Sequence, residues 1–160
     1  MAIIVHRTNL LFGLVACLGI GQFLAATCAA TASYPSAAGG AVSGYELSSH
    51  FLSDLGCTKT PDGLPNSNSA SLFNRSVIGL GIALIPFLCV LASHCGRAAW
   101  LAGACGCVSS AGLVGIGLTP YDIYFTAHHV ALGLWLVPML VWESSRSFGW
   151  LDSGWPLPAR

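Results

Sequence analysis

The amino-acid sequence predicts an all-α fold, namely a polytopic membrane helical bundle of about four transmembrane helices with one long outer loop. Of the 160 residues, 54% are hydrophobic and only 8% are charged, whereas about a quarter of an ordinary soluble domain is charged. The few charges leave four uncharged apolar runs, each near the roughly 20 residues that cross a bilayer as a helix. The residues that favour turns gather in one stretch between the first two runs.

The positions of the apolar runs set the predicted spans. Each run lies between two charged residues, and a connection of polar or turn-forming residues separates it from the next. The expected spans are residues 9–32, 76–93, 98–118 and 124–142. A break is expected near Gly96 and Arg97. The third span should be the best buried, because it is rich in small residues such as Gly103 and Gly106, which allow close helix packing in lipid.

The rest of the chain forms connections and ends. The outer loop comprises residues 33–75, and its apolar part from Tyr45 to Leu55 is expected to form a short helix followed by a turn. The chain after Trp142 is too short for a fifth span. Residues 1–160 are therefore expected to form a single integral membrane domain.

The distribution of Lys and Arg predicts the orientation in a cell membrane. The side that holds both termini carries four cations and the other side carries two, namely Arg7, Arg97, Arg146 and Arg160 against Lys59 and Arg75. We therefore expect a multi-pass protein with both termini in the cytoplasm and the long loop outside. A competing interpretation of the first span is a cleaved signal peptide, with residues 30–32 (ATA) as the cleavage motif.

The net charge restricts the partners. Six Lys and Arg balance six Asp and Glu, so the chain has no basic field for nucleic acid. The expected partners are the lipid bilayer and either another membrane protein or further copies of the chain. The seven cysteines lie mostly in or near the spans, where cysteine behaves as a small apolar residue. Cys57 is in the outer loop, and a bridge to Cys28 has no characteristic spacing.

Two groups of polar residues are candidates for function. His128 and His129 begin the fourth span, where ionisable side chains face an interior, a cavity or the headgroup layer. Asp122 precedes them and is also suited to cap that helix. Glu46, His50 and Asp54 recur every four residues, so that one helical turn would place them on one face to hold a cation or headgroup. A solvated amphipathic face is the alternative interpretation of this row.

Two segments together resemble a known family. Residues 49–56 read SHFLSDLG and residues 72–74 read LFN, while residues 115–122 read GIGLTPYD ahead of His128. This combination resembles a prokaryotic family of uncharacterised multi-span membrane proteins with an S-D-L-G loop. That family is similar to the eukaryotic damage-regulated autophagy modulator and Sfk-like membrane proteins. The matching positions are Ser53, Asp54, Leu55, Gly56, Asn74, Asp122 and His128.

The resemblance implies a helical bundle whose S-D-L-G loop faces outward, without an established catalytic activity. The eukaryotic relatives are connected with lipid distribution and phosphoinositide organisation, which implies a role with membrane lipids. Family members usually have about six spans, and this sequence has four. The chain is then either a shortened member or one that receives the missing pair from another subunit.

Three functions compete at this point. The first is a non-enzymatic protein that engages lipid headgroups or a membrane partner at its outer face, with Ser53, Asp54, Asn74, Asp122 and His128 as the binding residues. The second is a metal-dependent lipid hydrolase, in which His50, Asp54, Asp122 and His128, with His129 as an alternative histidine, would hold a zinc ion and its water. The third is a subunit in which His128 or His129 ligates a haem or chlorophyll. The first requires Asp54 and Asp122 to lie close together, with His128 nearer to them than His129 and a donor such as Asn74, Arg75 or His50 between the acids.

Overall fold

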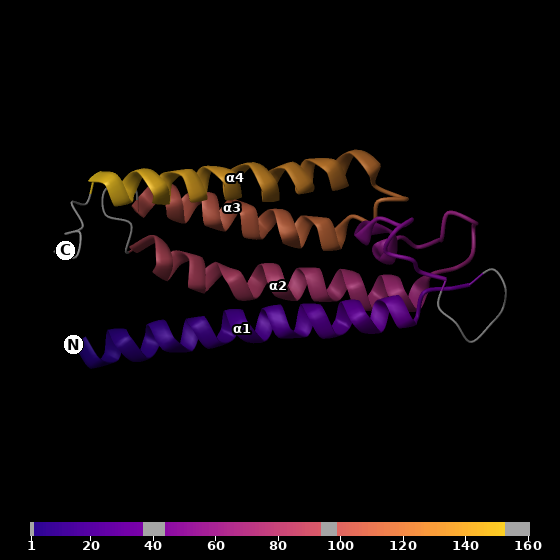
Figure 1. Cartoon of the computed structure of the whole chain (residues 1–160), viewed down its shortest axis with the longest axis horizontal. Coiled ribbons are helices and arrows are strands. Elements are labelled where there is room, and N and C mark those ends of the chain that lie inside the picture. Colours follow the sequence, from indigo (N-terminus) through magenta and orange to yellow (C-terminus); the bar gives the residue numbers. More distant parts are fainter. Residues whose placement is uncertain (1, 37–43, 94–98, 153–160) are drawn as a thin grey trace.

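The computed structural model describes residues 2–36, 44–93 and 99–152, and in these the chain is all-α (Figure 1). Within the described ranges the backbone forms no strand, and a single isolated antiparallel bridge pairs Lys59 with Pro65. The elements are α1 (Ala2–Ala32), the 3-10 helix η1 (Leu52–Gly56), α2 (Ser67–Ser93), α3 (Ala99–Leu118) and α4 (Phe125–Asp152). The predicted all-α class is confirmed.

The four long helices pack side by side in chain order. α1 packs on α2, α2 on α3 and α3 on α4, as the stacked ribbons in Figure 1 show. The start of α1 and the end of α4 lie at one end of the bundle, and η1 lies at the other, against α2 and α1. The described residues 44–66, which we call the lid, therefore cover one end of the bundle.

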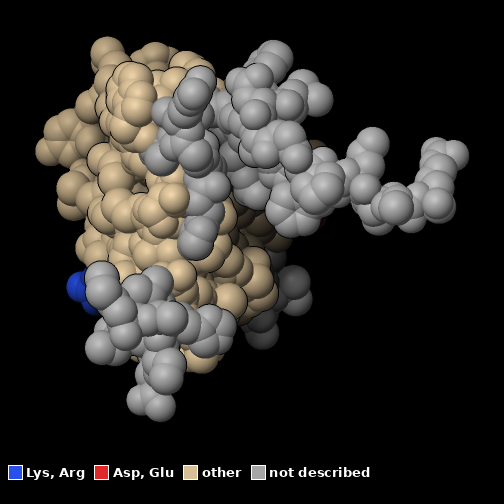
Figure 2. Space-filling view, turned by 90° about the vertical axis from the view of Figure 1, so that its left-hand side faces the viewer, with Lys and Arg blue, Asp and Glu red and all other residues tan. Residues whose placement is uncertain are grey.

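The lengths and surfaces of the helices are those of a membrane protein. Three candidate spans are long and apolar enough to cross a bilayer: Asn9–Ala32, Ser67–Ser93 and Trp100–Leu118. α4 contributes a shorter apolar stretch, Phe125–Val141. Large apolar side chains such as Leu18 and Leu140 stand 73% and 67% exposed on the outside of the bundle. The described atoms seen end-on in Figure 2 almost all belong to residues without charge. The exposed apolar side chains along the outside of the helices suit lipid rather than water.

The helix boundaries differ from the prediction mainly at α2. The second span was expected to begin at residue 76, but α2 begins at Ser67, nine residues earlier. The early turns form because the lid packs on them: Ser69 is fully buried and its hydroxyl donates to the Leu55 carbonyl over 3.1 Å. α1 extends back to Ala2 and α4 forward to Asp152. The expected break at Gly96 and Arg97 lies outside the described residues.

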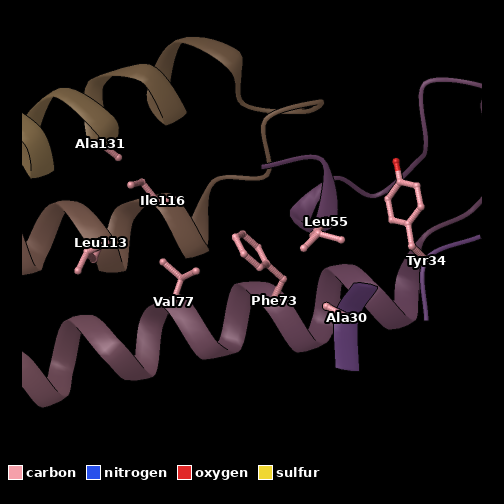
Figure 3. Packing of buried hydrophobic residues seen from close by; sticks show 8 residues of the cluster. All are labelled: Ala30, Tyr34, Leu55, Phe73, Val77, Leu113, Ile116 and Ala131. Atoms are coloured by element: carbon pink, nitrogen blue, oxygen red, sulfur yellow. The ribbon is translucent and has the colours of Figure 1, made fainter. Parts of the chain in front are cut away.

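Apolar side chains from all the helices and the lid meet at the lid end of the bundle. Leu55 from η1 is fully buried against Phe73 of α2, and the cluster continues along α2, α3 and α4 (Figure 3). Its members are Ala30, Tyr34, Leu55, Phe73, Val77, Leu113, Ile116 and Ala131. A smaller cluster, formed by Ala92 and Ala102, joins α2 to α3 toward the opposite end. The lid thus shares its core with the bundle.

α3 is the best buried of the three long candidate spans, as predicted. Its apolar window is 44% buried, against 22% for α2 and 11% for α1. A close approach of α3 to α4 occurs at a glycine that was not predicted. A Cβ on Gly112 would lie 2.5 Å from the Trp135 nitrogen of α4, whereas one on Gly106 would lie 3.0 Å from the Leu88 Cβ and one on Gly103 would lie 3.3 Å from the Ala92 Cβ. The third helix therefore packs closely on both α2 and α4.

The lid has a different local structure from the one expected. Residues 47–49 form a turn, in which the His50 N–H donates to the Glu46 carbonyl over 2.9 Å, and the only helical element is η1. The prediction of one helix that stacks Glu46, His50 and Asp54 on a single face is therefore wrong. The cause is local, because the Asp54 carboxylate accepts the Phe51 N–H over 2.8 Å and starts a new tight turn after His50.

Candidate functional site

The S-D-L-G segment is a capped 3-10 turn that anchors the lid. Asp54 caps it through Phe51, and the Cys57 N–H closes it by donating to the Asp54 carbonyl over 3.2 Å. Leu55 points into the shared core. Gly56 is required at the last position, because a Cβ there would collide with the side-chain oxygen of Asn74. The four residues therefore combine a cap, a hydrophobic anchor and a close approach to α2.

Three polar side chains donate hydrogen bonds to the backbone of this turn. Asn66 directly precedes α2, and Ser69 and Asn74 belong to it. The Asn66 amide nitrogen donates to the carbonyl of Cys57 over 2.9 Å, and also lies 3.3 Å from the Leu55 carbonyl and 3.4 Å from that of Asp54. The Asn74 amide donates to the Gly56 carbonyl over 2.9 Å, and Ser69 completes the set through Leu55. Asn66 is 1% exposed and Ser69 fully buried, so these bonds are shielded from water.

Asp122 joins the lid to the turn between α3 and α4. One oxygen of its carboxylate, Oδ2, accepts the Thr58 hydroxyl over 2.5 Å, the Thr58 N–H over 2.9 Å and the Lys59 N–H over 3.2 Å. The partners are 63 and 64 residues away along the chain. Asp122 was weighed as a cap of the last helix, and its observed hydrogen bonds go to the lid instead. Two successive backbone N–H groups of the lid thus converge on one carboxylate oxygen, and we call this pair the nest.

The same contacts set the ionisation of the groups around them. Burial alone would raise the pKa of Asp122, but the hydrogen bonds from Thr58 and Lys59 outweigh it and hold this pKa below its ordinary value. Burial, with the charges of Asp122 and Asp54, raises the pKa of the Cys57 thiol to about 11. Both carboxylates therefore act on Cys57, which directly follows η1 and directly precedes the nest.

An aromatic group forms the other side of the lid. The rings of Tyr34, Tyr45 and His50 have centroids 5.4–5.5 Å apart in each pairing. The Tyr34 hydroxyl is buried and has no hydrogen-bond partner among the described residues. Burial, followed by the charge of Asp54, raises the pKa of Tyr34 to about 12. The His50 ring packs on these tyrosines, and its Nδ1 lies 3.2 Å from the Glu46 carbonyl.

The two histidines of α4 differ in burial. His128 is 7% exposed, and its Nδ1 donates to the Thr119 carbonyl over 2.7 Å, which ties α4 to the end of α3. His129 is exposed, and its Nδ1 donates to the Phe125 carbonyl over 2.8 Å. The Tyr121 ring lies 5.7 Å from that of His128 and 5.6 Å from that of His129. Both histidines of α4 thus lie against Tyr121, in the turn that carries Asp122.

The predicted binding residues, Ser53, Asp54, Asn74, Asp122 and His128, all lie in the lid or in the helix ends next to it. Most of their recorded hydrogen bonds hold the fold together. The donors to the two acids are backbone N–H groups and Thr58, rather than Asn74, Arg75 or His50 as predicted. Whether these residues bind a ligand, and which histidine lies nearer to the acids, stay predictions.

The proposed metal set is not assembled. Over the described ranges, no three His, Cys, Asp or Glu residues come together as ligands of one ion, and this includes His50, Asp54, Asp122 and His128. A catalytic zinc site uses about three protein ligands. The hydrolase hypothesis therefore gains no support from the geometry.

Sequence reasoning missed Asn66, Ser69 and Thr58, which make the central contacts of the lid. An asparagine ahead of a helix is a typical N-cap residue, but among the described residues the Asn66 Oδ1 has no hydrogen-bond partner, so that signal does not predict the bonds that its amide nitrogen donates to the lid. Thr58 had no comparable signal, since its partner is remote in sequence.

Comparisons with protein-family models, curated proteins and solved structures gave no match.

Proposed function

We propose that this chain is a multi-pass membrane protein whose lid rests on the bilayer surface and engages lipid headgroups. The observation that carries the proposal is a set of large apolar side chains presented outward at the lid end. Leu47 and Phe51 of the lid are 80% and 78% exposed, and Leu52 is 46% exposed. In the turn before α4, Ile123, Tyr124 and Phe125 are 54–57% exposed.

The rigidity of the lid supports a membrane contact. The Asp54 carboxylate holds the start of η1 through the Phe51 N–H, and Asn66, Asn74 and Asp122 hold the backbone from Gly56 to Lys59. The exposed apolar groups are therefore held in place, and they would face water at a cost of roughly 25 cal/mol per Å² of apolar surface. Tyr and Phe at the end of a span also suit the interface between hydrocarbon and water. Insertion of this surface into the headgroup layer removes that cost.

Charge supports a headgroup partner. Lys59 in the lid and Arg75 in α2 are both exposed, and both belong to the lid end of the chain. A cation next to an apolar contact suits an anionic phosphate headgroup. The proposal includes the predicted orientation, with the lid outside and the termini in the cytoplasm. It also includes the resemblance to the S-D-L-G family, in which the corresponding loop faces outward.

Site-specific photocrosslinking tests the lipid contact directly. Benzoylphenylalanine is placed at Phe51 in the full chain, which is then reconstituted in nanodiscs of phosphatidylcholine with or without phosphatidylglycerol and irradiated. The same group at Asp62, an exposed acid of the lid, is the matched control. We expect a lipid adduct by mass spectrometry at position 51 and little or none at position 62.

The headgroup part is tested by charge. Lys59→Gln and Arg75→Gln should reduce the share of phosphatidylglycerol among the adducts without abolishing the adducts themselves. Absence of a lipid adduct at position 51 would contradict the proposal. A protein adduct at that position in native membranes, in place of a lipid adduct, would favour a membrane-protein partner instead.

A further inference from the structure

Two thiols meet between α2 and α3, far from the lid. The Sγ atoms of Cys89 in α2 and Cys107 in α3 lie 3.6 Å apart. Cys89 is exposed and Cys107 is half-buried, and both belong to the candidate spans. The pair therefore lies on the surface that faces lipid, and neither thiol takes part in the contacts of the lid.

The packing of the two helices explains why these sulfurs meet. A Cβ on Gly106 would lie only 3.0 Å from the Cβ of Leu88, and Ala92 and Ala102 are both buried nearby. Small residues at these positions let the two backbones approach closely. Cys105 packs instead against the Ala92 and Ala102 cluster. Cys107 rather than Cys105 therefore meets Cys89, and the Ala92 and Ala102 cluster holds the two helices together beside the pair.

We propose that Cys89 and Cys107 form a redox-active dithiol, which a lipid-soluble quinone oxidises to a disulfide between α2 and α3. In this step both S–H bonds break and one S–S bond forms. The two electrons and two protons pass to the two carbonyl oxygens of the quinone, which becomes a hydroquinone. A disulfide has an S–S length of about 2.0 Å, so the sulfurs need to approach by roughly 1.5 Å, within reach of side-chain rotation.

The location of the pair selects the oxidant. Thiol–disulfide exchange with a water-soluble disulfide proceeds through a charged thiolate, and a charge is costly in hydrocarbon. A quinone instead dissolves in the same hydrocarbon that the exposed Cys89 faces.

The test uses the full chain, reduced and then reconstituted in nanodiscs. Tetramethylbenzoquinone is added as the probe, because its fully substituted ring has no free position for thiol addition. Remaining thiols are alkylated, the protein is denatured and trypsin is added. Arg97 is the only Lys or Arg between the two cysteines, so cleavage there separates their fragments unless a disulfide joins them. We expect joined fragments without reductant, separate fragments with reductant, and about one hydroquinone per disulfide.

Matched variants make the result specific. Cys89→Ser and Cys107→Ser should each abolish the link, and Cys89→Ala should do so without a new polar group. Cys105→Ser should leave the link intact. Fragments that separate without reductant in the wild-type chain would overturn the proposal, as would links between chains in place of the internal link. Equally fast oxidation by glutathione disulfide would overturn the quinone as the oxidant.

Discussion

Replacement of Asn66 should loosen the lid more than any other single polar change. Its amide nitrogen donates toward three backbone carbonyls and lies closest to that of Cys57, at 2.9 Å. Asn66→Ala leaves the Cys57 carbonyl without this donor, whereas the Leu55 carbonyl keeps its bond from Ser69. Asn66→Asp keeps the size of the side chain but replaces the donor with an anion that faces carbonyl oxygens.

The magnitude follows from one buried group. A buried polar group left without its partner costs about 1–3 kcal/mol, so Asn66→Ala should destabilise the closed lid by about that amount. Asn66→Asp should cost at least as much. This expectation opposes the helix dipole, which would favour an anion at the start of α2 by about 0.3–1 kcal/mol. The sign of the change in lid stability in Asn66→Asp therefore distinguishes the loss of the donor from the effect of the helix dipole.

The Cys57 thiol reports the opening of the lid. It is 5% exposed, it is the only cysteine between residues 33 and 75, and burial contributes most to raising its pKa to about 11. A water-soluble maleimide reacts with an accessible thiolate, so its rate measures the population of the open lid. A cost of about 1–3 kcal/mol corresponds to labelling that is about 5–150-fold faster.

The matched control is Asn68, which is exposed in the first turn of the same helix. Asn68→Ala and Asn68→Asp should change the labelling rate less than about twofold, as is usual for surface sites. Helical content by circular dichroism should stay the same in all four variants. Unchanged labelling in both Asn66 variants, or equal acceleration in the Asn68 controls, would refute the assignment of Asn66 as the main support of the lid.

Three further predictions concern the bundle, the orientation, and the hydrogen bonds from Thr58 and Lys59 to the Asp122 carboxylate, which we call the acid clamp. Gly112→Ala should destabilise the bundle by about 1–3 kcal/mol in detergent unfolding, because its Cβ would meet the backbone of α4, whereas Gly133→Ala has open space and should be neutral or stabilising. The pKa of Asp122 is lowered in the folded state. Its contribution to the stability of the folded lid is therefore complete above the ordinary pKa of 3.8 and is lost as the pH falls through its pKa in the folded state. Hydrogen exchange at the Thr58 amide should therefore accelerate in acid, and Asp122→Asn should flatten this dependence; unchanged protection would contradict the clamp. In intact cells, an impermeant maleimide should label Cys57 of the loosened-lid chain from outside, and labelling only after lysis would reverse the orientation.

The helices were predictable because their signal is local. An uncharged apolar run of about 20 residues has few alternatives to a membrane helix, and the end of α3 at Leu118 was predicted to the residue. The start of α2 was not predictable in this way. Ser67 and Ser69 favour turns over helix when considered alone, and the helix extends over them because the buried Ser69 hydroxyl finds a partner in the lid.

The site was predictable only in its broad location. Charge positions and span number place the lid and the Asp122 turn on the same side, and the contacts between Asp122 and Thr58 confirm this. The identity of each partner depends on tertiary structure, because Thr58 and Asp122 are 64 residues apart. A side chain whose partner is so distant carries no local pattern, and the same holds for the approach of Gly112 to α4.

The clamp limits where a headgroup phosphate binds. The N–H groups of Thr58 and Lys59 form the anion nest of the lid, and the Asp122 carboxylate already occupies both. A phosphate in the nest would have to displace a carboxylate that three hydrogen bonds hold in its charged form, and the two anions would repel. We therefore expect headgroups to bind at exposed side chains of the lid, such as Phe51 and Lys59, with the nest closed. Removal of the carboxylate in Asp122→Ala opens the nest, so this variant should gain affinity for free phosphate while its lid becomes less stable. A variant that loses lid stability without gaining phosphate affinity would show that the nest exists only when Asp122 holds the loop in shape.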